Sequence, residues 1–220
     1  MILSLKLSEI KEYVSTQLNN FFPDKNYVKP MDFNGILDLT LDKLDYCFNK
    51  MIIDRYKKEQ TIFNHLYSDQ YLIFLWFLSN SVWSIKNNDN LANKIYYLNK
   101  SLHAFDCLYD TKLPDIFYVA HGIGTMLGKA KYSNYFVVLQ GCTVGAWNGI
   151  YPSFGEGVAL AANTSVIGNC KIDNRVTISS NTSIFNKNIP SNSIVYNNPE
   201  SGQLFIRDTD FHFVDKVFKM

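Results

Sequence analysis

One histidine of this sequence stands among glycines: His121 opens the segment "HGIGTMLG". A neutral imidazole can accept a proton from a hydroxyl group at physiological pH, so a histidine beside an acceptor can act as a general base. His65 lies in a helical pattern and His212 in the last segment, and we expect both to be structural. His103 lies three residues before Asp106 and is a weaker candidate for lining a site. His121 is therefore the candidate for proton transfer.

The cysteines do not suggest a metal or redox centre. The sequence has four: Cys47, Cys107, Cys142 and Cys170. No two are close enough for a C-x-x-C motif, and such scatter is typical of reduced thiols in a cytoplasmic protein. Proton transfer by an imidazole needs no metal, so we expect no metal site.

Composition excludes several classes of function. The chain has 220 residues, a net charge of +1 and 47% hydrophobic residues, which is typical of a globular protein without a nucleic-acid surface. Charges at Lys6, Glu9 and Lys11 interrupt the apolar run that a signal peptide would need. The most apolar stretch, 71–83, is too short to span a membrane. We therefore expect a cytoplasmic protein without a membrane span.

The apolar residues of the elements that must position His121 recur with two different periods. In the second half of the chain the period is six residues. A large apolar residue recurs at every sixth position: Phe154, Leu160, Val166, Ile172, Ile178 and Ile184. A second column is small or β-branched until its last member: Val158, Thr164, Cys170, Val176, Thr182 and Asn188. This period predicts a β-solenoid, in which each six-residue unit supplies a short strand and a turn. A β-sandwich would instead show a period of two with irregular turns.

The first hundred residues show the period of a helix. Apolar spacings of three and four predict helices around residues 10–18, 37–51, 63–85 and 91–102. Ser8 is available as an N-cap for the first helix, and "NNDN" at 87–90 predicts the turn before the last. The sequence thus predicts an α+β chain. Its expected parts are an α-helical domain at 1–112, a β-helix domain at 113–200 and a C-terminal tail at 201–220.

Three stretches carry a resemblance to a known family. They are "HGIGTMLG" (121–128), "LQGCTVG" (139–145) and "YPSFGEGVALAANTSVIGN" (151–169). Each is similar to a motif of the hexapeptide-repeat acyltransferases. Within that family the sequence most resembles serine acetyltransferase and the O-acetyltransferases of bacterial surface polysaccharides, over about Asp106 to Pro199. The resemblance implies an N-terminal helical domain followed by a left-handed parallel β-helix, acetyl-CoA as co-substrate, and a homotrimer with sites shared between subunits.

The resemblance also implies roles for single residues. His121 matches the position of the family's general base. Asp106, fifteen residues earlier, matches the position of the aspartate that orients this base in the family. Such a carboxylate fixes the imidazole tautomer and stabilises the imidazolium that forms. The positions matching the family's small cofactor-groove residues are Gly145, Ala146, Ala162 and Ser180. These roles predict direct attack of an acceptor hydroxyl on the thioester.

The sequence departs from serine acetyltransferase where that enzyme binds its amino acid. Ala120 replaces an aspartate, and Ile150 with Tyr151 replaces an Arg-His pair, so a zwitterion would lack charged partners. The loop at these positions instead offers Trp147 and Tyr151, whose aromatic faces suit sugar rings. We therefore expect the acceptor to be a sugar hydroxyl in a bacterial surface polysaccharide, either capsule or O-antigen.

Other functions stay open. The chain could be a serine O-acetyltransferase of cysteine biosynthesis, an N-acetyltransferase of an amino sugar, or a β-helix assembly module without activity. A β-helical carbonic anhydrase would need three zinc-binding histidines, and the expected β-helix holds only His121. We set that alternative aside.

Overall fold

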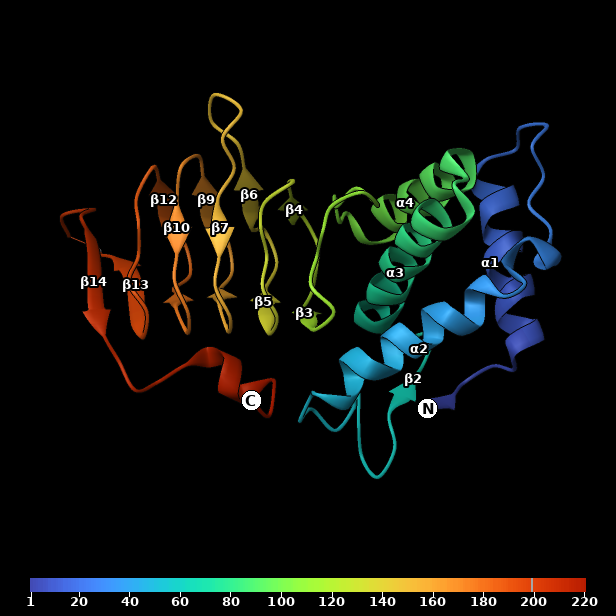
Figure 1. Ribbon diagram of the computed structural model, residues 1–220, viewed down its shortest axis with the longest axis horizontal. Coiled ribbons are helices and arrows are strands. Elements are labelled where there is room, and N and C mark those ends of the chain that lie inside the picture. Colours follow the sequence, from blue (N-terminus) through green and yellow to red (C-terminus); the bar gives the residue numbers. More distant parts are fainter. Residues whose placement is uncertain (199) are drawn as a thin grey trace.

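The computed structural model describes residues 1–198 and 200–220, so Pro199, where the resemblance ends, lies outside the described residues. Helices form the first half of the chain and a stack of short parallel strands forms the second (Figure 1). The α-helices are α1 (Leu7–Phe21), α2 (Ile36–Asn49), α3 (Ser68–Lys86) and α4 (Asp89–His103). A 3-10 helix, η1 (Pro30–Phe33), and two paired strands, β1 (Ile2–Leu3) and β2 (Ile62–Phe63), complete this half. The helical prediction is confirmed.

The structure corrects the predicted start of α1 and confirms a turn between α3 and α4. The prediction that Ser8 is the N-cap of α1 is wrong, because Lys6 holds the cap position and the Glu9 carboxylate accepts its backbone N–H at 2.7 Å. The turn predicted at 87–90 is confirmed for Asn87 and Asn88, whereas residues 89 and 90 already belong to α4. Asn87 follows the end of α3 in the left-handed conformation, and the Asn88 side chain caps α4.

Helix α3 is the centre of the helical half. It packs against α2, α4 and β3 (Phe117–Val119), the first strand of the β-helix. Its buried residues run without a break from Asp69 to Ser79. A helix buried on all sides is expected to be apolar throughout, so a carboxylate in this run requires partners.

Three sheets form the faces of the β-helix. The first is a six-stranded sheet of β3, β5 (Phe136–Val138), β8 (Ala159–Leu160), β11 (Thr177–Ile178), β13 (Ser193–Asn197) and the antiparallel β14 (Leu204–Asp208). The second is a four-stranded sheet of β4 (Met126–Leu127), β6 (Thr143–Gly145), β9 (Ser165–Ile167) and β12 (Ser183–Phe185). The third pairs β7 (Ser153–Phe154) with β10 (Lys171–Ile172). The predicted fold, helices followed by a left-handed parallel β-helix in an α+β chain, is confirmed.

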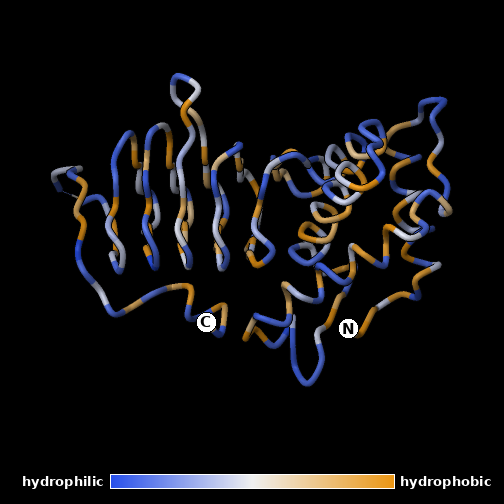
Figure 2. The backbone as a smooth tube through the Cα atoms, viewed as in Figure 1, coloured by the Kyte–Doolittle hydropathy of each residue, from blue (hydrophilic) through white to orange (hydrophobic). Residues whose placement is uncertain are grey.

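The six-residue ladder lies inside this triangle. Leu160 stacks on Ile178, Val166 on Ile184 and Phe154 on Ile172, each pair eighteen residues apart. All six are at most 2% exposed. One apolar column in the sequence therefore becomes three columns in space, because three hexapeptides complete one coil. Figure 2 shows the resulting alternation of hydrophobic and hydrophilic residues along the coils.

The corners between the sheets need left-handed backbone. At the corner between the six-stranded and four-stranded sheets this conformation occurs in register at Gly124, Gly141, Asn163 and Asn181, and His121 adopts it as well, three residues before Gly124. At the next corner Gly168 has φ 83°, and a Cβ there would lie 2.3 Å from Asn186 Oδ1. That oxygen accepts the Asn169 N–H at 2.8 Å, so the turn has no room for a side chain. We call the first of these corners the His121 corner.

The C-terminal segment does not trail away from the fold. After β14 the chain returns along the β-helix to the end of α2 (Figure 1), and we call residues 209–220 the strap. Phe213 N–H donates to Thr177 Oγ1 at 3.2 Å, and Val217 O accepts the Ile52 N–H at 2.9 Å. The strap therefore touches both halves of the molecule.

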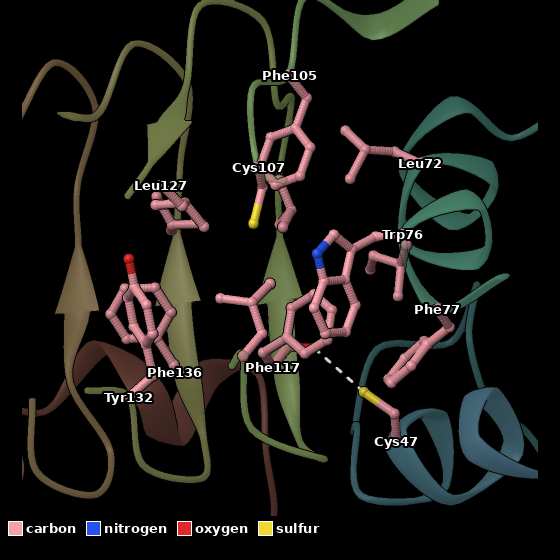
Figure 3. Packing of buried hydrophobic residues seen from close by; sticks show 14 of the residues in the cluster. Cys47, Leu72, Trp76, Phe77, Phe105, Cys107, Phe117, Leu127, Tyr132 and Phe136 are labelled. Atoms are coloured by element: carbon pink, nitrogen blue, oxygen red, sulfur yellow. Dashed lines mark hydrogen bonds between the residues drawn. The ribbon is translucent and has the colours of Figure 1, made fainter. Parts of the chain in front are cut away.

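The two halves share one core. Figure 3 shows Trp76 and Phe77 of α3 packed against Phe117 of β3, with ring centroids 5.3 Å apart in both pairs. The Cys47 thiol of α2 donates to the Phe117 carbonyl at 3.2 Å. The helices thus cover the first coil of the β-helix, which would otherwise expose its core. The residue boundaries 112/113 and 200/201 stay predictions.

Candidate active site

His121 occupies the turn that joins β3 to β4. Its backbone is left-handed, with φ 52°, and its side chain is 74% exposed. The following residue is Gly122, and a Cβ there would lie 2.5 Å from Leu72 Cδ1 of α3, so a larger residue would force the Leu72 side chain to move. Helix α3 therefore lies directly against the turn that presents the imidazole.

Asp69, near the start of α3, contacts this turn. Its Oδ1 accepts the His121 backbone N–H at 3.0 Å, and its Oδ2 lies 4.0 Å from His121 Nδ1. The residue is 4% exposed. Burial raises the pKa of Asp69, while the N–H and ring of His121 and the charge of Arg55 act in the opposite direction. Our sequence analysis missed Asp69. The available signal was an acidic residue opening the most apolar helix.

The structure does not bring Asp106 to His121. Asp106 Oδ1 accepts the Tyr96 hydroxyl at 2.7 Å, and Oδ2 pairs with Lys100 Nζ at 2.6 Å, both from α4. Burial raises the pKa of Asp106, but these two hydrogen bonds outweigh it and hold the pKa below its usual value. Both carboxylate oxygens are therefore engaged by the helical half. The role predicted for Asp106 stays a prediction without a supporting contact.

The four predicted cofactor residues form two groups. Ala162 and Ser180 stack at the His121 corner, where the Ala162 carbonyl accepts the Asn181 N–H at 2.9 Å. Gly145 and Ala146 lie at the opposite, C-terminal ends of the strands of the four-stranded sheet, where β6 ends. Both groups have small side chains that leave the backbone approachable, as a pantetheine arm requires. One copy of the chain does not bring the two groups together.

The loop that follows β6 carries the predicted substrate residues. Trp147 and Ile150 close it with two backbone hydrogen bonds of 3.0 Å, and it projects beyond the coils (Figure 1). Trp147 is 53% exposed and packs edge-on against Phe185 at 5.3 Å. The Tyr151 ring lies against Gly128. His121 precedes β4, whereas the loop follows β6 in the same parallel sheet. They therefore lie at opposite ends of the strands of that sheet.

The outer face of the four-stranded sheet has an apolar rim. Ile123, Met126, Trp147, Ile150 and Phe185 are all exposed along it. Small residues stack in register across its centre, namely Thr143, Ser165 and Ser183. A flat face with an apolar rim is suited to packing against another protein surface.

The remaining titratable groups do not form a second centre. His103 hydrogen-bonds Asn99 at 2.7 Å, and burial lowers its pKa to about 4, which keeps the ring neutral. All four cysteines are free and buried. Over residues 1–198 and 200–220, no three His, Cys, Asp or Glu side chains lie close enough to hold a metal ion. In the same residues no helix is long and apolar enough to cross a membrane.

The N-terminal helices and the left-handed coils define an architecture: a left-handed parallel β-helix preceded by a helical domain. Among solved structures, the chain is similar to the serine acetyltransferase of Brucella abortus strain S19, with a TM-score of 0.72 and 16% identity over 93% of this chain and 84% of that one. It is also similar to the serine acetyltransferase of Neisseria gonorrhoeae, with a TM-score of 0.70 and 14% identity over 96% and 83%.

A third similar structure is serine acetyltransferase isoform 3 of Entamoeba histolytica, solved in complex with cysteine. It has a TM-score of 0.60 and 20% identity over 89% of this chain and 72% of that one. The sequence matches no protein-family model and no curated protein. At these identities the likeness establishes the fold, and it extends over the helical half as well as the β-helix.

Proposed function

We propose that this protein is an acetyl-CoA-dependent O-acetyltransferase in which His121 is the general base. The observation that carries the proposal is the placement of an exposed histidine at the corner of a fold shared over more than nine-tenths of the chain with serine acetyltransferases. His121 takes the acceptor hydroxyl proton as the hydroxyl oxygen bonds to the thioester carbonyl carbon. The C–S bond then breaks, and the imidazolium returns the proton to the coenzyme A sulfur.

Acetyl-CoA supplies the activated acyl group, and the chain's own residues hold it. Ala162 and Ser180 lie at the His121 corner without bulky side chains, which fits a pantetheine arm lying along the backbone. Gly145 and Ala146 complete the groove only if they come from a second copy. The acceptor is held next to His121, where proximity contributes a large part of the rate.

For the acceptor, serine or a similar small hydroxyl compound is now the first candidate. The structural relatives are serine acetyltransferases over more than nine-tenths of this chain, and none of that likeness points to a polysaccharide. The sugar acceptor expected from the sequence becomes the second candidate. It depends on the exposed Trp147 and on the uncharged residues Ala120 and Ile150.

A thiol-release assay separates the two acceptors. The protein is incubated with acetyl-CoA and either L-serine or a panel of sugars and oligosaccharides. Release with serine alone supports the first candidate, and release with glycans alone supports the second. An absence of thiol release with every acceptor, from folded protein that binds acetyl-CoA, would favour the assembly module instead.

We also propose that three copies pack around an axis through the apolar face of the four-stranded sheet. This arrangement would cover Met126 and Phe185 and would bring the loop of one copy toward the His121 corner of the next. Light scattering should then report a trimer or an assembly of trimers. A stable monomer of 25.3 kDa would rule out a shared site.

A further inference from the structure

The start of α3 is built around a buried carboxylate. Asp69 uses one oxygen on the His121 backbone and presents the other 4.0 Å from the ring, as described above. A contact of 4.0 Å is too long for a hydrogen bond but close enough for an ion pair once the ring is protonated. The geometry gives one side chain two functions, one on the backbone and one on the imidazole.

The backbone function answers a conformational problem. His121 has φ 52°, a strained region that residues other than glycine rarely adopt. The carboxylate holds that conformation through the backbone N–H at 3.0 Å. Since a charged acceptor makes a stronger hydrogen bond than a neutral one, Asp69 fixes the direction in which the imidazole leaves the turn.

Asp69 is itself held in place. The neighbouring Gln70 is 1% exposed; it accepts the Asn64 N–H at 2.7 Å and donates to the Arg55 carbonyl at 2.8 Å. These bonds fasten the loop before α3 to the helix. Besides His121, the ionisable groups that face Asp69 are Arg55, Tyr56 and Tyr118. Burial raises the pKa of both tyrosines, which keeps them neutral. Arg55 contributes a positive charge near Asp69.

The alternative carboxylate is engaged elsewhere. Asp106 shares a short ion pair with Lys100 and a hydrogen bond with Tyr96, which use one oxygen each. Its negative charge is balanced within the helical half. The cation at 2.6 Å offsets part of the charge that this carboxylate could offer to an imidazolium.

We propose that Asp69, and not Asp106, is the positioning residue of His121, so that the helical half supplies the carboxylate partner of a histidine on the β-helix. The negative charge beside Nδ1 favours the tautomer that carries its proton on Nδ1 and leaves Nε2 free to accept one. The catalytic consequence depends on the function proposed above, but the tautomer does not.

The test is to read the His121 tautomer by long-range 1H–15N correlation at pH 8, with assignment by the His121→Ala spectrum. The wild-type ring should be mainly in the Nδ1–H form. Asp69→Asn keeps an oxygen for the backbone N–H but removes the charge, and it should move the Nδ1 resonance toward the unprotonated position. Asp106→Asn should leave the resonance where it is.

Two results would overturn the proposal without any need for activity. One is a wild-type ring in the Nε2–H form, which requires no variant to fold. The other is a tautomer change in Asp106→Asn but not in Asp69→Asn. The resonances of the half-buried His103, which is hydrogen-bonded to Asn99, report whether each variant keeps its native fold.

Turnover gives the second measurement. Asp69→Asn should lower kcat at least about tenfold with little change in KM for acetyl-CoA. Asp38→Asn is the matched control, since Asp38 is also acidic in a first helical turn but is exposed. If no acceptor is ever acetylated, the proposed function fails while the tautomer result stands.

Discussion

The helical half and the β-helix bury their side chains by different means. In the β-helix a buried residue stacks on its counterpart about eighteen residues away, as Ile178 does on Leu160. In the helical half and at the junction, partners have no fixed spacing, as in the bond from Cys47 to Phe117, seventy residues apart. The β-helix carries His121 at the corner of its first coil, whereas packing without a repeat brings Asp69 to it. The difference teaches that the candidate site depends on both rules.

The largest expected effect concerns the residue that the β-helix contributes. His121→Ala should reduce turnover about a hundredfold or more and leave acetyl-CoA affinity nearly unchanged, because the variant loses the base but not the groove. Thiol release and calorimetric binding measure the two quantities. His65→Ala, in the helical half, serves as the control and should behave as wild type. Near-normal turnover of His121→Ala on a confirmed acceptor would show the assignment to be wrong.

A matched pair of core variants tests whether the two halves pack differently. Ile73 in α3 and Ile178 in β11 are both 0% exposed, and truncation of either to alanine should cost about 2–5 kcal/mol of unfolding free energy. Denaturant unfolding measures the cost. Hydrogen exchange should locate it: Ile178→Ala should expose the amides of the stacked strands β8 and β13, whereas Ile73→Ala should affect α2 and α4.

Uniformly raised exchange in both variants would break this comparison. It would mean that the shared core around Trp76 and Phe117 unfolds the two halves as one unit.

The third expected effect is a pH dependence of the unfolding free energy that comes from His103, in the helical half. Burial lowers the pKa of His103 to about 4 in the folded state, against about 6.5 when unfolded. Below about pH 6.5 the unfolded chain binds this proton more readily, so stability is present above that pH and is lost as the pH falls toward about 4. The loss amounts to about 3 kcal/mol at most. His103→Gln should flatten this limb of the stability curve in urea unfolding. An unchanged limb would mean that other groups cause it.

The sequence predicted the β-helix well because each coil repeats the same local information. Phe154, Leu160 and Val166 could be assigned to the interior from spacing alone, since every coil solves the same packing problem. His121 was identified by its neighbouring glycines and by the resemblance, not by the repeat. The repeat could not pair that histidine, because the burial of Asp69 depends on where α3 meets a turn fifty-two residues later.

Other features escaped prediction for related reasons. The Asp106 spacing came from a resemblance, and a spacing does not show that Tyr96 and Lys100 engage both carboxylate oxygens. The strap has no period at all. Its position depends on contacts such as the one between Asp215 and Arg175, at 2.8 Å, that join residues forty apart.

The strap changes how the molecule can come apart. A solenoid without long-range contacts can fray from its last coil inward, one layer after another, with each layer held only by its neighbour. Here residues 217–219 hydrogen-bond to residues 50–52, so the far end of the stack is tied to the end where the stack begins. Fraying of the last coil must therefore release the strap from the helices or strain it. Unfolding of the last coil and detachment of the strap from the helical half are therefore expected to be coupled.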